Sequence, residues 1–268
     1  MITDLRGSTG VITGGASGIG LATAHRLAAE GMQLVLADIE AGPLDAAVAE
    51  VRAVGVDVEG VVTDVTDLAS VEALADAAFG RFGSVHFLFN NAGVAVSGPI
   101  AEMTHADWKW TIDVDLWGPI HGVEAFLPRM IEQNQGGHIV NTASFAGLVP
   151  NDGLGVYCVA KYGVVALSEV LQRELRPHEI GVSVLCPMRV ATNIDDSGRN
   201  RQGAYGGPDA QQYPDVDEEE MSGRMIAVED VAQLVVDGIA DNSLYLFPHE
   251  VARQFIARRF DRIDRAFG

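Results

Sequence analysis

The chain has 268 residues, of which 48% are hydrophobic, and a formal net charge of −19. This composition predicts a folded protein with a substantial core, and the negative net charge opposes nucleic-acid binding, which depends on Lys and Arg. No apolar run reaches the ~18 residues of a membrane span, and no signal peptide is visible. Cys158 and Cys186 lack the spacing of a metal site. We therefore expect a soluble cytoplasmic protein with no disulfide and no bound metal.

Short apolar runs alternate with amphipathic stretches along most of the chain. The runs predict strands at residues 9–13, 33–38, 56–62, 85–89, 138–142, 181–186 and 244–246. Helices are predicted between them, at residues 18–30, 43–54, 68–82, 105–133, 154–176 and 228–239. Alternation of this kind is typical of a parallel sheet with helices on both faces. We predict an α/β fold over residues 1–268: a single domain with a Rossmann-like, doubly wound, seven-stranded sheet in a three-layer α/β/α arrangement.

Two segments depart from this alternation. Residues 193–223 are polar and irregular and follow the sixth strand, at the sheet edge where open α/β sheets bind ligands. A long irregular stretch in that place predicts a substrate lid. Residues 249–268 form a basic amphipathic tail with five arginines. The tail is expected to cross to a neighbouring subunit or to lie on an anionic membrane, and the net charge of −19 disfavours the membrane.

A glycine-rich loop joins the first strand to the first helix. Gly14, Gly18 and Gly20 let the backbone approach a ligand closely, since a Cβ would hold a phosphate away. Backbone N–H groups at a helix N-terminus are an anion site. The loop, with Ser17 and Ile19, therefore predicts the binding site of a dinucleotide pyrophosphate.

Asp38 ends the second predicted strand, 24 residues after Gly14. A carboxylate in this place accepts hydrogen bonds from the ribose hydroxyls of an adenosine and repels a 2′-phosphate. Ile39 follows it, and no arginine lies within residues 15–19. We therefore predict NAD rather than NADP as the cofactor.

Tyr157 and Lys161 are four residues apart on a predicted helix, a spacing that places two side chains on one face. An ammonium beside a phenol favours the phenolate and lowers the tyrosine pKa from about 10, which makes an acid/base pair. Lys109 and Lys161 are the two lysines of the chain, whose cations are otherwise arginines. An isolated pair of this kind is more often a solvated surface feature, so its meaning depends on the other motifs.

Five motifs occur in a fixed order: Thr13-Gly14-x-x-x-Gly18-x-Gly20, Asp64-Val65, Asn90-Asn91-Ala92-Gly93, Ser144 and Tyr157-x-x-x-Lys161. In this order they resemble the short-chain dehydrogenase/reductase family, in its compact single-domain branch. The resemblance implies that Tyr157 is the general acid/base, that Lys161 assists it and binds the nicotinamide ribose, and that Ser144 binds the substrate oxygen. It also implies further contacts to the cofactor from Asp64, Val65, Asn91, Ala92, Gly93, Pro187, Val190 and Thr192.

Two positions depart from the family pattern. Asp115 stands where the family usually has a catalytic Asn, and an ionised Asp only accepts hydrogen bonds. We therefore expect a changed proton relay to Lys161, with Asp115 still counted among the catalytic residues. Met188 replaces the glycine that often follows Pro187. Together with Val96 and Phe145, Met188 predicts an apolar substrate wall beside Ser144.

The leading hypothesis is an NAD-dependent oxidoreductase that interconverts a hydrophobic secondary alcohol and its ketone. An NADP-linked carbonyl or 3-oxoacyl-thioester reductase is the second hypothesis, and a non-catalytic NAD-binding regulator is the third. The resemblance also implies a homo-oligomer, either a tetramer or a dimer. The tryptophans Trp108, Trp110 and Trp117 belong either to the core or to that interface.

Overall fold

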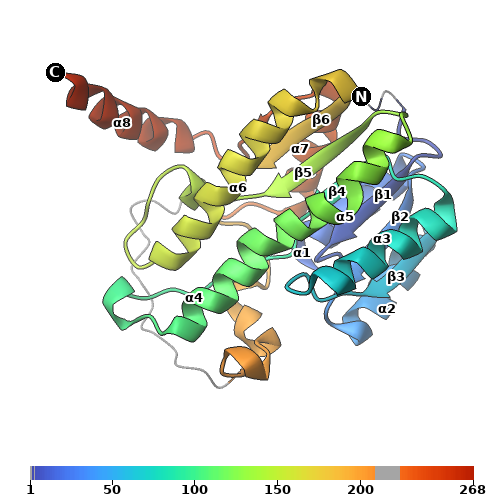
Figure 1. The fold of residues 1–268 in the computed structure, drawn as a ribbon, viewed down its shortest axis with the longest axis horizontal. Coiled ribbons are helices and arrows are strands. Elements are labelled where there is room, and N and C mark those ends of the chain that lie inside the picture. Colours follow the sequence, from blue (N-terminus) through green and yellow to red (C-terminus); the bar gives the residue numbers. More distant parts are fainter. Residues whose placement is uncertain (1, 3, 209–223) are drawn as a thin grey trace.

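The structure is a computed structural model that describes residues 2, 4–208 and 224–268. Its centre is a sheet with helices on both faces (Figure 1). The strands are β1 Thr9–Thr13, β2 Gln33–Asp38, β3 Val58–Val62, β4 Phe87–Asn90, β5 Gly137–Thr142, β6 Ile180–Leu185 and β7 Tyr245–Leu246. The main helices are α1 Gly18–Ala29, α2 Ala41–Arg52, α3 Leu68–Phe82, α4 His105–Ile112, α5 Gly118–Glu132, α6 Gly155–Glu174, α7 Val228–Asp241 and α8 Ala252–Asp264.

The seven strands follow the order β3-β2-β1-β4-β5-β6-β7, and all neighbouring strands are parallel. The predicted fold class is therefore confirmed. The order reverses between β1 and β4, and the carboxyl ends of both strands meet there. In open α/β sheets this is the place where ligands bind.

Alternation of apolar side chains along the strands builds a core on each face of the sheet. In β1, Ile12 belongs to one apolar cluster and its neighbour Val11 to the other. The first cluster receives residues of α1, α2 and α7, and the second receives residues of α3, α5 and α6. Burial on both faces explains why the central strands are largely apolar, whereas the edge strand β3 is partly exposed and contains Glu59.

The single helix predicted over residues 105–133 is interrupted in the structure. Thr104 and Asp107 form a capping box at the start of α4. A π-helical turn, η2 (Asp113–Trp117), then separates α4 from α5. Turns of this kind are rare and concentrate at functional sites, and this one contains Asp115.

The two irregular segments have partly regular structure. The first part of the predicted lid forms two 3₁₀ helices, η5 (Ile194–Asn200) and η6 (Gly203–Tyr205), and its residues 209–223 lie outside the described part of the chain. The basic tail forms α8, which points away from the rest of the molecule (Figure 1). In the part of the chain that the structure describes, no helix has the length and apolar character needed to cross a membrane.

Candidate active site

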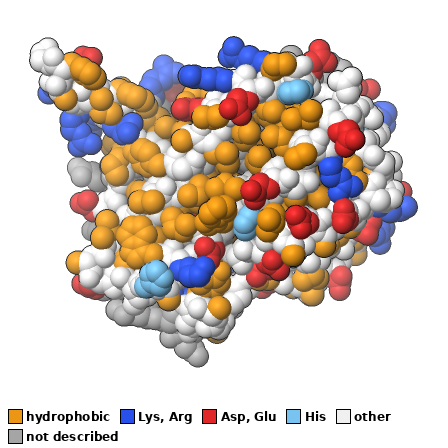
Figure 2. Space-filling model, in the orientation of Figure 1, with side chains coloured by type: hydrophobic (Ala, Val, Ile, Leu, Met, Phe, Trp, Pro, Cys, Tyr) orange, Lys and Arg blue, Asp and Glu red, His pale blue; other side chains and the backbone are white. Residues whose placement is uncertain are grey.

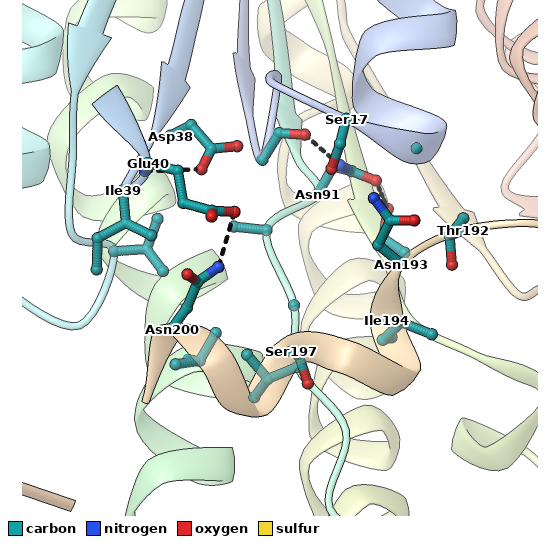
Figure 3. Close-up of a pocket in the computed structure, with 18 of the residues that line it drawn as sticks. Ser17, Asp38, Ile39, Glu40, Asn91, Thr192, Asn193, Ile194, Ser197 and Asn200 are labelled. Carbon is teal, nitrogen blue, oxygen red and sulfur yellow. Dashed lines mark hydrogen bonds between the residues drawn. The ribbon is translucent and has the colours of Figure 1, made fainter. Parts of the chain in front are cut away.

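The carboxyl ends of the central strands surround one cavity, and η5 lies across from them (Figure 3). Most of the predicted cofactor residues line it: Gly14, Ser17, Gly18, Ile19, Asp38, Ile39, Asp64, Val65, Asn91, Ala92, Gly93, Tyr157, Lys161 and Thr192. Three others, Gly20, Pro187 and Val190, are not part of the lining. The structure thus brings together residues separated by nearly 180 positions in the sequence.

The glycine loop forms a cradle at the N-terminus of α1. Gly14 and Gly18 have positive φ angles of 63° and 53°, which favour glycine. A Cβ on Gly14 would lie 2.9 Å from the Cα of Ala92, so a larger residue does not fit. Ser17 caps the helix without a side-chain hydrogen bond. The first N–H groups of α1 are therefore available to an anion, and the cradle fits a dinucleotide pyrophosphate.

Asn91 connects the ends of neighbouring strands at the cavity through three side-chain hydrogen bonds. Its side-chain amide donates to the carbonyl oxygens of Thr13 (3.2 Å) and Gly14 (3.3 Å). Its Oδ1 accepts a hydrogen bond from the hydroxyl of Thr142 at 3.1 Å. These bonds connect the ends of β1, β4 and β5, so Asn91 fixes the glycine loop relative to the strand that leads to Ser144.

Asp38 closes one corner of the cavity. Its two carboxylate oxygens accept hydrogen bonds from the backbone N–H groups of Ala16 and Glu40, each at 3.1 Å. Burial raises the pKa of Asp38, and these backbone bonds oppose the change. The carboxylate is therefore fixed in place beside the glycine loop, where an adenosine ribose would lie if a dinucleotide occupied the cradle.

Lys161 anchors the other end of the cavity. Its ammonium donates to the carbonyl oxygen of Thr142 at 3.1 Å and lies 5.5 Å from the centre of the Tyr157 ring. The side chain is only 2% exposed although both residues line the cavity. The spacing of four residues on α6 therefore places the phenol and the ammonium side by side, as the sequence predicted.

Asp115 reaches the same ammonium from the π-helical turn. Its Oδ1 lies 3.6 Å from Lys161 Nζ and accepts a hydrogen bond from the backbone N–H of Val94 at 2.9 Å. Within the described residues its Oδ2 has no hydrogen-bond partner. Complete burial raises the pKa of Asp115 to about 6, and the charge of Lys161 opposes this effect. A carboxylate, rather than an amide, thus faces the lysine.

The predicted substrate residues lie outside the cavity lining. The hydroxyl of Ser144 accepts from the N–H of Ala146 at 3.1 Å and donates to the carbonyl of Pro187 at 3.3 Å. Phe145 is buried and packs edge-on against Phe255 of α8. Val96 and Met188 belong to two different apolar clusters, and neither lines the cavity.

Sequence reasoning missed the residues that face the cavity from η5 and the turn after it. The hydroxyl of Ser197 accepts from the N–H of Ala95 at 3.1 Å, and the amide of Gln202 donates to Asp64 at 3.0 Å. Arg199 and Asn200 bind Glu40, which follows β2. No local pattern signals such contacts, because their partners are more than 100 residues apart in the sequence.

The parallel sheet, the glycine cradle and the carboxylate of Asp38 at the end of β2 define a class, the nucleotide-cofactor-binding domains of Rossmann type. Comparison with known proteins identifies the family within this class. The chain matches the family described as short chain dehydrogenase over residues 9–203. It belongs to the short-chain dehydrogenase/reductase family, as predicted, and is an oxidoreductase that acts on an alcohol or a ketone.

Several relatives cover nearly the whole chain. A C alpha-dehydrogenase of Sphingobium sp. strain SYK-6 is 34% identical, and the match covers 97% of this chain and 86% of that protein. The 1-deoxy-11-beta-hydroxypentalenate dehydrogenase of Streptomyces avermitilis is also 34% identical, over 97% of this chain and 92% of that protein. A solved short-chain dehydrogenase/reductase from Burkholderia phymatum, in complex with NAD, is 39% identical with a TM-score of 0.92, covering 99% of this chain and 97% of that chain.

Proposed function

We propose that the protein is an NAD-dependent dehydrogenase that interconverts a hydrophobic secondary alcohol and its ketone. The observation that carries this proposal is the pair of Tyr157 and Lys161, which line the cavity together, with Lys161 tethered to the end of β5. A phenol beside a fixed ammonium can exchange a proton with a substrate oxygen near neutral pH.

In this proposal Tyr157, assisted by Lys161, transfers the proton, and Ser144 positions the substrate oxygen. Tyr157 takes the proton of the alcohol or returns it to the ketone, and Lys161 stabilises the phenolate. Ser144 turns its hydroxyl from Pro187 to the substrate oxygen and stabilises the charge that develops there. The nicotinamide supplies the hydride acceptor or donor when bound. Thr192 lines the cavity and would contact the carboxamide of the nicotinamide.

NAD is supported over NADP by the carboxylate of Asp38, fixed beside the cradle by two backbone hydrogen bonds. A 2′-phosphate at this corner would meet that negative charge at close range. The Burkholderia phymatum structure, with NAD bound, supports the same choice. Comparable kcat/KM values with both cofactors would favour the alternative, an NADP-linked carbonyl or 3-oxoacyl-thioester reductase.

A hydrophobic substrate is supported by an apolar part of the wall of the cavity that Tyr157 also lines. Val94, Trp110 and Val114 line the cavity and belong to one buried apolar cluster. The relatives from Sphingobium and Streptomyces are named as dehydrogenases of a C alpha position and of a hydroxypentalenate. An apolar wall favours substrates that lose little hydration on binding.

A panel of alcohols tests the proposal. Purified protein is incubated with NAD⁺ at alkaline pH and with cyclic, aromatic and terpenoid secondary alcohols, and the formation of NADH is followed by absorbance. Oxidation of hydrophobic secondary alcohols is expected. A preference for polar sugar alcohols would reject the substrate class. Binding of NAD⁺ without turnover of any alcohol would favour the non-catalytic regulator.

Asp115 should influence the pH dependence of the reaction. Above pH 6 its carboxylate is ionised and partly neutralises the charge of Lys161, 3.6 Å away. Asp115→Asn removes that negative charge, so Lys161 stabilises the phenolate of Tyr157 more strongly. The acidic limb of the pH profile of kcat for alcohol oxidation should move to lower pH by about one unit. The control is Asp113→Asn on the same turn, which affects a half-buried carboxylate that pairs with the exposed Lys109. An unchanged or raised limb in Asp115→Asn would contradict this role.

A homo-oligomer is supported by the face that carries α5 and α6. Figure 2 shows hydrophobic side chains gathered over this face, and Trp117, Val159 and Val170 are among the exposed large apolar residues. Trp110, in contrast, is buried in the core of its own chain. An exposed patch of this kind favours association of two chains. The mass in solution, from sedimentation, decides between a monomer and a dimer or tetramer.

A further inference from the structure

An arginine that is distant in sequence reaches the corner of the cavity beside Asp38. Arg199 belongs to η5, which faces the end of β2 across the cavity (Figure 3). Its Nη2 lies 2.7 Å from Glu40 Oε2, and its Nε donates to Glu40 Oε1 at 3.3 Å. Asn200 donates to the same Oε2 at 2.9 Å. The sequence around Asp38 contains no arginine, so this guanidinium enters only through the fold.

Glu40 engages this guanidinium through two parallel hydrogen bonds. Such a bidentate pair is the arrangement that a guanidinium also offers to a phosphate. The remaining terminal nitrogen, Nη1, donates to the carbonyl of Asp196 at 2.9 Å. The hydrogen bond that Arg199 donates to Glu40 is the largest cause that raises the pKa of Arg199, and the charges of Asp196 and Asp38 also contribute. In turn, the Arg199 bond lowers the pKa of Glu40. The guanidinium is thus held in a bidentate pair by Glu40, and the exposed carboxylate of Asp196 lies 3.6 Å from its Nη1.

This geometry matters for the choice between NAD and NADP, and the inference rests on the proposed function. With a dinucleotide in the cradle, the ribose 2′ position lies at the corner of Asp38. A 2′-phosphate placed there comes close to Arg199. If Arg199 were unpaired, it would attract that phosphate and offset the repulsion from Asp38. The bidentate bond to Glu40 keeps Arg199 from binding the 2′-phosphate.

We propose that Glu40 is a second specificity-determining residue. It binds Arg199 in a bidentate ion pair, withholds the guanidinium from a 2′-phosphate, and adds a negative charge near Asp38. Asp38 selects the two ribose hydroxyls, and Glu40 prevents an arginine from reversing that selection. The cofactor choice therefore depends on a contact between two segments about 160 residues apart.

Glu40→Gln tests the proposal, because it keeps the size of the side chain and the backbone N–H that binds Asp38. Calorimetric titration with 2′,5′-ADP and with 5′-AMP measures the contribution of the 2′-phosphate without any turnover. We expect Kd for 2′,5′-ADP to fall about tenfold in Glu40→Gln, since Arg199 loses its bidentate anionic partner and its Nε and Nη2 can bind phosphate. Kd for 5′-AMP should change by less than about twofold. Glu59→Gln, which removes a partner of the exposed Arg81 outside the cavity, should leave both values unchanged.

The double variant Glu40→Gln/Arg199→Gln shows whether Arg199 is responsible. The gain for 2′,5′-ADP should disappear in it, with the fold of each variant checked by thermal melting. An unchanged Kd for 2′,5′-ADP in Glu40→Gln, or a gain that persists in the double variant, overturns the role of Glu40. Failure of the unaltered protein to bind 5′-AMP, NAD⁺ or NADP⁺ would overturn the proposed function itself. The two failures are therefore distinguishable.

Discussion

Replacing Tyr157 by Phe should lower kcat for alcohol oxidation by roughly 10²–10⁴-fold, the range that general acid/base catalysis contributes. The substitution removes only the hydroxyl, so the ring remains beside the Lys161 ammonium. Binding of NAD⁺ should change little, because the cradle, Asp38 and Asn91 are untouched. Initial rates with a secondary alcohol give kcat, and titration of the intrinsic protein fluorescence gives the affinity for NAD⁺.

The matched control for this variant is Tyr162→Phe. Tyr162 lies on the same helix, α6, and its hydroxyl donates to the carbonyl of Leu148 at 2.8 Å. It does not line the cavity of Tyr157 and Lys161. Loss of this hydroxyl should leave kcat within about twofold of the unaltered enzyme, with at most a small loss of stability. Oxidation that continues at the unaltered rate in Tyr157→Phe would exclude Tyr157 as the acid/base.

The parts of the site that the sequence predicted are those fixed by local geometry. Tyr157 and Lys161 meet because a helix brings residues four apart together. The glycine loop lies at the N-terminus of α1 because a strand, a turn and a helix follow one another in the chain. Asp38 reaches the cavity because parallel strands end at the same edge of the sheet. The alternation of elements also predicted a parallel, doubly wound sheet of seven strands, and right-handed crossovers leave few possible strand orders for it.

The remaining parts depend on contacts that have no local signal. Asp115 faces Lys161 because a π-helical turn interrupts the predicted helix and the Val94 N–H holds the carboxylate. Phe145 was expected in a substrate wall, but α8 covers it through Phe255. Arg199 meets Glu40 only after η5 folds across the cavity. Each of these arrangements depends on packing between segments that are distant in the sequence. Periodicity and motif spacing carry no information on such packing.

Replacing Lys161 by Met should impair both catalysis and stability. The phenolate of Tyr157 loses its cation, so kcat should fall by roughly 10²-fold or more. Asp115 remains as a fully buried carboxylate without its partner, and breaking a buried ion pair from one side typically costs about 3–5 kcal/mol of the free energy of unfolding. Urea unfolding and initial rates measure the two effects separately.

The second lysine of the chain provides the control. Lys109 is exposed and pairs with Asp113 on the neighbouring turn of the helix. Lys109→Met makes the same chemical change at a surface where solvent replaces the lost interaction, so both kcat and the urea midpoint should stay close to those of the unaltered enzyme. Equal losses of stability in the two variants would contradict the assignment of Lys161 and Asp115 as a buried pair.

The pH dependence of the Lys161→Met defect identifies its cause. Burial already raises the pKa of Asp115 from 3.8 to about 6, whereas Lys161 acts to lower it. A carboxyl group with a raised pKa in the folded state stabilises the fold fully below its unfolded pKa, and loses that contribution as the pH rises through the folded pKa. Without Lys161 the folded pKa rises further, so the loss continues to higher pH. The destabilisation should therefore be larger at pH 8 than at pH 5.

Adding Asp115→Asn to Lys161→Met removes the unpaired negative charge and should recover a large part of the lost stability at pH 8. It should not recover the lost kcat, because catalysis needs the ammonium itself. A defect of equal size at both pH values, or a double variant no more stable than Lys161→Met, would mean that lost packing rather than an unpaired carboxylate causes the instability.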